Sequence, residues 1–171
     1  MLDQPTDLKT RLSDPALLET RAYVNGQFIA GDATFNVTNP ARGDVIAEVT
    51  DLNRAQVAEA IAAAKTAQKD WALWTGKERA AVLRKWFDLM MAHQEDLAVI
   101  LTAEMGKPLA EARGEIAYGA SFVEFFAEEA KRIYGETIPG PQRDKRIMVM
   151  KQPIGVVGSI TPWNFPNAMI T

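Results

Sequence analysis

Few residues of this sequence have side chains of the types common in catalytic sites, and the most distinctive cluster of candidate residues lies near its C-terminal end. The run 160–166, ITPWNFP, places Asn164 between Trp163 and Phe165 at the end of an apolar segment. A carboxamide is a neutral hydrogen-bond donor that needs no titration. Asn is also well suited to begin a helix or to occupy a turn. Taken alone, the residue leaves both uses open, and the two aromatic residues beside it would be assigned to core packing.

Other common catalytic groups are scarce. The 171 residues contain no cysteine and a single histidine, His93. The lack of cysteine excludes, within these residues, a disulfide framework, a thiolate metal site and a cysteine nucleophile. His93 stands beside Gln94 and Glu95 at the polar end of a predicted helix, where we expect a surface position. One histidine without cysteine also argues against a transition-metal cluster.

The composition is that of a globular chain. Hydrophobic residues make up 47% and charged residues 24%, which is typical of a folded domain. The net charge of -3 argues against nucleic acid as the main partner, because proteins that bind phosphate backbones carry a basic surplus. The N-terminus lacks the apolar core of a secretory signal, and no stretch approaches the roughly 20 apolar residues of a membrane span. We therefore expect a soluble, cytoplasmic protein with no membrane partner.

The elements that must position Asn164 begin with a small antiparallel β region. Asn25 and Gly26 lie between two short apolar runs, which is the strongest local signal for a hairpin with a type I′ turn. A β segment with alternating Phe35 and Val37 follows, and a turn leads to a third apolar run over 45–49.

From about residue 53 the apolar spacing becomes helical, with Val57, Ile61, Ala64 and Trp71 near one face. Three further helices are predicted. The first begins at a capping box formed by Thr75 and Glu78, and the second is a shorter helix that ends at Gly106. The third and longest helix runs from about 108 to 134 with Gly135 as its terminator.

Two glycines interrupt the longest predicted helix. Gly114 and Gly119 each cost roughly 1 kcal/mol relative to alanine, so we expect a close helix or sheet contact at each. The charged residues of the long helices are predicted to form solvated faces with i,i+4 pairs such as Glu128 with Arg132, and none is assigned to catalysis.

Strand patterns return after Gly140. Ile147 and Val149 alternate along one predicted strand, and the segment 154–160 is a near-continuous apolar run of the kind found in a strand buried on both faces of a parallel sheet. The fold class is therefore α/β. A parallel strand needs a crossover helix and a neighbouring strand, yet little sequence follows it. Either another chain covers this strand or the sequence is a fragment, and we favour the fragment.

Several blocks together resemble the aldehyde dehydrogenase superfamily, and the resemblance extends from about Tyr23 to the last residue. The blocks are 76–79 with 83–86, 104–108 (EMGKP), 151–156 (KQPIGV) and 160–166. Within the superfamily, 127–135 and 166–171 most resemble NAD(P)-dependent succinate-semialdehyde dehydrogenases, and glutarate-semialdehyde enzymes are the close alternative. Asn167 departs from the succinate-semialdehyde pattern, which has a small residue there.

This resemblance implies a fold and its division into three segments. Residues 1–135 correspond to the N-terminal portion of the cofactor-binding domain, and 136–153 to a β-arm that pairs with a neighbouring subunit to form a homo-oligomer. Residues 154–171 correspond to the first parallel strand and the cofactor loop of that domain. The charged residues Lys145 and Lys151, near the ends of the arm's second strand, suit an exposed strand edge.

The resemblance also implies roles for individual residues. Four residues are expected to line NAD or NADP: Ile160, Thr161, Pro162 and Trp163. They lie at the end of a predicted sheet strand, which is where open α/β sheets bind ligands. Asn164 matches the asparagine that stabilises the oxyanion formed when a cysteine thiolate adds to an aldehyde. In the family pattern the cysteine nucleophile and the glutamate base lie beyond Thr171. We therefore expect the 171-residue chain to be inactive alone.

Two hypotheses of different class follow. The first is a portion of an enzyme that oxidises an aldehyde, with succinate semialdehyde as the expected substrate. The second is a non-catalytic binding or assembly module that keeps the scaffold without its chemistry. The aromatic cluster Phe122, Phe125 and Phe126 is expected either in the core or against another subunit, and so suits both hypotheses.

Overall fold

The computed structural model describes residues 7–171. The first six residues lie outside this range. They belong to the N-terminal stretch that lacks a secretory signal pattern and to the predicted segment 1–135. The helices of the described chain are α1 (Arg54–Trp71), α2 (Gly76–Ala92), α3 (Gln94–Met105) and α4 (Leu109–Glu129). Its strands are β1 (Ala22–Val24), β2 (Gln27–Ile29), β3 (Ala33–Thr38), β4 (Val45–Asp51), β5 (Glu136–Pro139) and β6 (Arg146–Val149).

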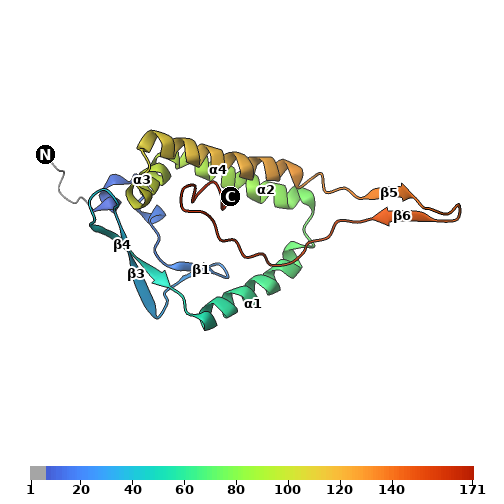
Figure 1. Ribbon diagram of the computed structural model, residues 1–171, viewed down its shortest axis with the longest axis horizontal. Helices are drawn as coiled ribbons and strands as arrows, with labels where there is room; N and C mark the ends of the chain where they lie inside the picture. Colours follow the sequence, from blue (N-terminus) through green and yellow to red (C-terminus); the bar gives the residue numbers. More distant parts are fainter. Residues whose placement is uncertain (1–6) are drawn as a thin grey trace.

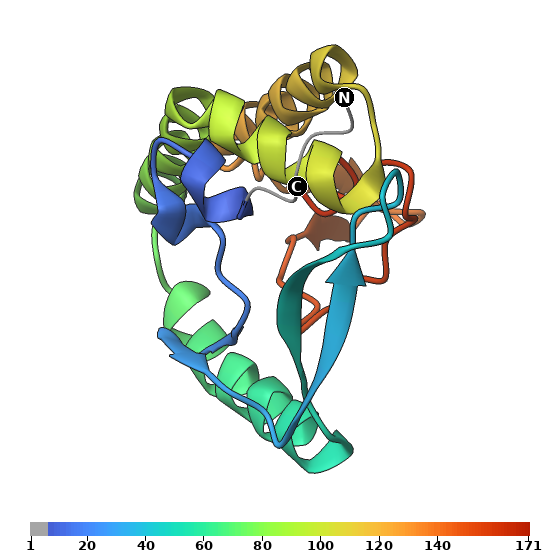
Figure 2. The same ribbon diagram turned by 90° about the vertical axis from the view of Figure 1, so that its left-hand side faces the viewer.

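Helices α2, α3 and α4 pack together on one side of the molecule, and α1 lies opposite them with β1 (Figures 1 and 2). The C-terminal segment runs from the base of the β5–β6 hairpin past α1 and ends beneath α4 (Figure 1). The hairpin itself projects away from the body. Two short 3-10 helices, Leu8–Arg11 and Pro15–Leu17, lie beside α3 at the far end.

The predicted small β region is confirmed. β1 and β2 pair antiparallel across Asn25 and Gly26, whose φ angles of 50° and 80° are the positive values that a type I′ turn requires. β3 pairs antiparallel with β4, and Phe35 stands opposite Val49.

The predicted helix starts and stops are largely confirmed because they depend on local hydrogen bonds. The Thr75 hydroxyl accepts from the Glu78 amide, and the Glu78 carboxylate accepts from the Thr75 amide at 2.7 Å. Asn53 and Gln56 form a second capping box at the start of α1. Gly106, with φ of 84°, ends α3 in the left-handed region as a C-terminal glycine does.

The predicted end of the longest helix is wrong. α4 stops at Glu129, and Lys131 and Arg132 donate to the carbonyls three residues earlier, which tightens the last turn. Gly135 serves a different purpose. A Cβ at this position would lie 2.3 Å from the Val149 carbonyl oxygen, so glycine permits the close approach of the two sides of the hairpin.

The core lies between the three packed helices. One cluster joins α3 to α4 and contains Ala98, Leu101, Ala112 and Ile116. A second joins α2 to α4 and contains Met90, Ala120 and Val123, with Leu83 and Phe87 packed against it. Leu8 and Leu12 form a third cluster with α3. The apolar faces of α2 and α3 therefore both pack against α4.

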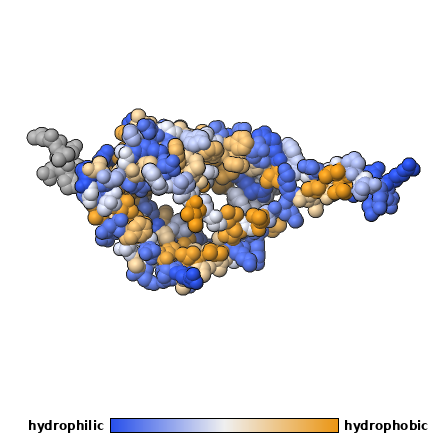
Figure 3. Space-filling model, viewed as in Figure 1, coloured by the Kyte–Doolittle hydropathy of each residue, from blue (hydrophilic) through white to orange (hydrophobic). Residues whose placement is uncertain are grey.

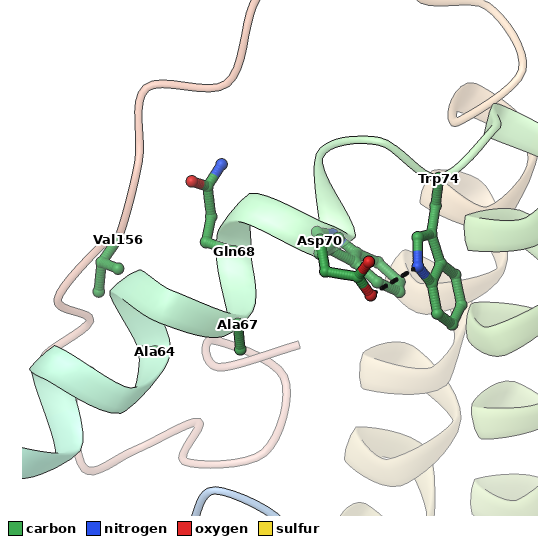
Figure 4. A pocket seen from close by; sticks show the side chains of 7 residues that line it. Ala64, Ala67, Gln68, Asp70, Trp74 and Val156 are labelled. Atoms are coloured by element: carbon green, nitrogen blue, oxygen red, sulfur yellow. Dashed lines mark hydrogen bonds between the residues drawn. The ribbon is translucent and has the colours of Figure 1, made fainter.

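Helix α1 has no buried residue, although its apolar side chains share a face. A hollow of about 480 Å³ lies along that face, between the helix and Val156. Figure 4 shows its lining, in which the Trp74 indole donates to the Asp70 carboxylate at 3.1 Å. The predicted apolar stripe exists, but within residues 7–171 it packs against little.

The predicted hairpin at 136–153 is formed, since β5 and β6 pair antiparallel with Ile138 opposite Ile147. All eight of their residues are exposed. The predicted parallel strand at 154–160 is not formed. The segment is irregular and open to solvent, and Ile154 and Ile160 are 95% and 103% exposed. A parallel strand needs a hydrogen-bonded neighbour, and no strand in the described portion of the chain lies beside this segment.

Asp96 gives a test of how the N-terminal segment is attached. Its carboxylate is buried and accepts hydrogen bonds from the Ser13 and Asp14 amides at 2.9 and 2.8 Å. These bonds hold the pKa of the Asp96 carboxyl below its ordinary value. A lowered folded-state pKa contributes stability above the unfolded pKa, and this contribution is lost as pH falls through the folded value.

We expect Asp96→Asn to lower the thermal midpoint at pH 7 and to remove part of its decline below about pH 4. Thermal unfolding followed by circular dichroism between pH 2 and 7 measures both effects. Asp88→Asn, which changes an exposed carboxylate on α2, is the control. An unchanged pH profile in Asp96→Asn would contradict the assigned role.

Candidate functional site

The loop that carries Asn164 ends in a helix-like turn. The Met169 amide donates to the Phe165 carbonyl at 3.0 Å, and the Thr171 amide donates to the Asn167 carbonyl at 3.3 Å. Ala168 is the one buried residue of this turn. The chain after Pro166 therefore makes about one helix-like turn without forming a regular helix up to Thr171.

Glu115 of α4 caps this turn from the side. Its Oε1 accepts from the amides of Asn167 and Ala168 at 2.9 and 3.3 Å. The residue is only 3% exposed, so the carboxylate is almost withdrawn from water. Amides at the start of a helical turn have no partner within the turn, so a negative charge that accepts their hydrogen bonds is favourable.

Lys107 supplies the opposite charge. Its Nζ lies 2.5 Å from Glu115 Oε2 and donates to the Asn164 carbonyl oxygen at 2.8 Å. The same ammonium lies 4.0 Å from the centre of the Phe165 ring, within the range of a cation–π contact. The Lys107 side chain is 9% exposed. One buried ion pair therefore fixes the main chain at Asn164 on one side and at Asn167 and Ala168 on the other.

Gly119 explains how the turn comes so close to α4. A Cβ at this position would lie 2.3 Å from Asn167 Oδ1 and 2.9 Å from Thr171 Oγ1. The close contact predicted for Gly119 is thus present. The one predicted for Gly114 is absent, because a Cβ there would meet nothing within 4 Å.

A shallow hollow of about 370 Å³ lies on the other side of the loop, lined by Val37, Glu104, Met105, Trp163 and Pro166. Partial loss of hydration raises the pKa of the Glu104 carboxyl above its ordinary value, although the residue as a whole is exposed. Trp163 is 79% exposed, which removes core packing within this chain as the explanation for it.

The residues assigned to cofactor binding are consecutive and lead directly into the anchored turn. They are Ile160, Thr161, Pro162 and Trp163. The amides of Ile160, Thr161 and Trp163 donate no hydrogen bond within the described chain, and the Asn164 side chain is likewise without a bonded partner there. The segment therefore presents free backbone groups and apolar side chains next to a free carboxamide.

Sequence reasoning missed Lys107 and Glu115. Glu115 falls among the charged residues of the long helices that are predicted to be solvated, and Lys107 enters only as part of the EMGKP block. Glu115 carried a further signal, because it follows Ala112 by three residues and precedes Gly119 by four. That spacing sets a carboxylate on the apolar face of a helix, where burial requires partners.

The pair predicted between Glu128 and Arg132 is wrong. Arg132 binds Glu129 at 2.5 Å, and Glu128 instead accepts from Arg84 of α2 at 3.3 Å. The helix ends at Glu129, so the register that an i,i+4 pair needs is lost beyond it. Phe125 and Phe126 are exposed. Within residues 7–171 no cluster of three or more metal-ligating side chains occurs.

The chain belongs to the aldehyde dehydrogenase family, whose model matches residues 28–171. The predicted α/β fold of the N-terminal portion of that family is confirmed. The aldehyde dehydrogenase of Brucella melitensis biovar abortus superposes with a TM-score of 0.90 at 56% identity, over 93% of this chain and 33% of that one. The succinate-semialdehyde dehydrogenase of Burkholderia pseudomallei gives a TM-score of 0.89 at 56% identity, over the same shares.

Among curated relatives, the glutarate-semialdehyde dehydrogenase of Pseudomonas putida is 58% identical over 94% of this chain and 34% of its own length. The NADP(+) succinate-semialdehyde dehydrogenase of Escherichia coli is 55% identical over the same shares. The chain thus spans about a third of the length of these relatives. No helix within the described residues has the length and hydropathy needed to cross a membrane.

The two glycines of α4 form a matched pair for testing the close approach. We expect Gly119→Ala to lower the free energy of unfolding by about 1–3 kcal/mol, because the added methyl displaces the Asn167 and Thr171 side chains and presses on the main chain at Ala168. Gly114→Ala should raise it by about 0.5–1 kcal/mol, because it gains helix propensity in open space. Urea unfolding measures both changes, and equal effects of the two substitutions would contradict the contact.

Proposed function

We propose that this chain supplies the N-terminal third of an NAD(P)-dependent dehydrogenase that oxidises a small, negatively charged aldehyde. Succinate semialdehyde is the first candidate, and glutarate semialdehyde is the alternative. The overall reaction converts an aldehyde, water and NAD(P)⁺ into the carboxylic acid, NAD(P)H and a proton. The observation that carries the proposal is the match of residues 28–171 to the family, together with identities of 55–58% to enzymes named for these two aldehydes.

A third relative supports the charge of the substrate. The 3-sulfolactaldehyde dehydrogenase of Pseudomonas putida is 55% identical over 94% of this chain. The three named substrates share an aldehyde and a separate anionic group. Identity over this third of the protein does not separate them, since all three relatives lie at 55–58%.

The types of groups in the expected cofactor loop, 160–163, suit a nicotinamide dinucleotide. Exposed Ile160 and Trp163 offer apolar contact to a planar ring, and the free amides of the same segment offer hydrogen bonds to sugar or phosphate oxygens. When bound, the nicotinamide accepts the hydride released by the aldehyde carbon. The residues present would form one wall of that site. One relative is an NADP(+) succinate-semialdehyde dehydrogenase and one structural neighbour is a complex with NAD+, so the proposal covers both cofactors.

Asn164 is the residue of this chain that we assign to catalysis. As a nucleophile adds to the aldehyde, negative charge develops on the carbonyl oxygen. A carboxamide fixed nearby donates a hydrogen bond to that charge without itself changing protonation. The free Asn164 side chain and its main chain held by Lys107 are the arrangement such a donor requires.

The β5–β6 arm is proposed to pair with a second subunit. It projects from the body and exposes Ile138, Ile147 and Met148, and Figure 3 shows hydrophobic side chains gathered along it. An isolated two-stranded hairpin is marginally stable at best, so a partner strand or surface would complete it.

In the complete enzyme, Asn164→Ala should lower turnover roughly a hundredfold or more, corresponding to about 3–4 kcal/mol of transition-state stabilisation. Asn164→Asp should be slower still, because a carboxylate repels the developing oxyanion. Steady-state oxidation of succinate and glutarate semialdehydes, followed as NAD(P)H absorbance, measures both effects. Unchanged turnover in Asn164→Ala, at an unchanged thermal midpoint, would refute this role.

The extent of the reading frame that contains these residues distinguishes the enzyme hypothesis from the hypothesis of a non-catalytic module. We expect it to continue past Thr171 into a cysteine-bearing segment, and we expect the complete product to oxidise one of the two semialdehydes. The purified 171-residue chain should show no such activity, since it contains no cysteine. A frame that ends at Thr171, or activity from the isolated chain, would overturn the proposal.

A further inference from the structure

We infer that Glu115 is a positioning residue that sets the place of the Asn164 carboxamide, with Lys107 as its partner. The inference rests on the proposed role of Asn164 and deepens it. Glu115 touches neither the expected cofactor loop nor the reacting atoms. Its effect on the reaction would pass through the main chain of the turn that follows Asn164.

The hydrogen bonds require a carboxylate at position 115. Oε1 accepts from the Asn167 and Ala168 amides while Oε2 accepts from the Lys107 ammonium. All three partners are donors. A glutamine of the same shape has one acceptor oxygen and one NH₂ group, so in either orientation it directs a donor toward another donor. Only an ionised carboxylate satisfies both sides.

The burial of the pair makes the arrangement rigid. The side chains of Glu115 and Lys107 are 1% and 9% exposed. Buried charges are costly unless they are paired and hydrogen-bonded, so neither side chain has a comparable alternative position in water. The ion pair therefore adopts one geometry, and the turn attached to it does so too.

The attachment points begin at Asn164 and continue into the turn that follows it. Lys107 binds the carbonyl of Asn164 itself, and Glu115 binds the amides three and four residues later. The turn between them lies against Gly119, where no Cβ separates the segments. The side chain of Asn164 is free, while its carbonyl group and the turn that follows it are both anchored. A fixed backbone with an unengaged donor is what a preorganised oxyanion site needs.

A double-mutant cycle in the complete enzyme tests the inference. Glu115→Gln, Asn164→Ala and the double variant are compared by kcat/KM for the semialdehyde at saturating NAD(P)⁺. We expect Glu115→Gln to lower kcat/KM about tenfold, because small displacements of catalytic groups cost on this scale. In the Asn164→Ala background the same change should cost less than about twofold, because residues that act as a unit are not additive.

Two further measurements separate positioning from general stability. Glu111→Gln alters an exposed glutamate one turn earlier on α4 and should leave kcat/KM unchanged. Glu115→Asp, which keeps two acceptor oxygens, should recover some of the activity lost in Glu115→Gln. If Glu115→Gln does not fold, as judged by circular dichroism and elution volume, Glu115→Asp takes its place in the cycle. KM for NAD(P)⁺ should stay within about twofold in every folded variant, because the affected step is oxyanion stabilisation.

The outcomes are distinguishable. An equal loss from the Glu115 change with and without Asn164 would overturn the positioning role while leaving the proposed function intact. The same holds if the folded Glu115 variant keeps full activity. If Asn164→Ala alone has no effect, the proposed role of Asn164 fails, and the inference fails with it.

Discussion

The ion pair between Lys107 and Glu115 is the interaction on which the C-terminal segment depends. From 150 to 162 the chain makes no regular structure, and most of its apolar side chains face solvent. From Asn164 onward it is anchored by Lys107, in the connection between α3 and α4, and by Glu115 of α4. A buried carboxylate needs several donors to offset its lost hydration, and the ammonium with two backbone amides provides them. The same bonds that make the charge tolerable also determine where the loop lies.

The helical layer is built to hold that pair. α4 carries Glu115 between Ala112 and Gly119 on the side that meets α3 and the loop, and Gly106 turns the chain so that Lys107 reaches the same place. The small side chains keep the elements close enough for direct hydrogen bonds. Packing and electrostatics thus act together, since larger residues along this face would separate the donors from the carboxylate.

Local signals in the sequence were reliable where the structure depends on local bonds. The Asn25–Gly26 turn, the capping box at Thr75 and the glycine stop at Gly106 each involve residues within four positions of one another. Glu115 could be recognised only by its spacing along α4, because its partners are 8 and more than 50 residues away. Composition and periodicity carry no information on which distant donors will meet a buried acceptor.

The segment 154–160 shows the other limit of sequence reasoning. Its apolar, β-branched composition favours a buried strand, but a strand exists only when a neighbour accepts its hydrogen bonds. No such neighbour occurs within residues 7–171, and the segment stays irregular.

The apolar face of α1 is in the same condition. Val57, Ile61 and Trp71 share a side of the helix and remain exposed, and Trp71 lines the hollow to which Val156 also contributes. Both the helix face and the segment 154–160 therefore present apolar side chains that no element of residues 7–171 covers. A neighbouring strand would supply the hydrogen bonds that 154–160 lacks, and it would hold the free backbone groups of 160–163 next to a carboxamide whose carbonyl Lys107 already anchors.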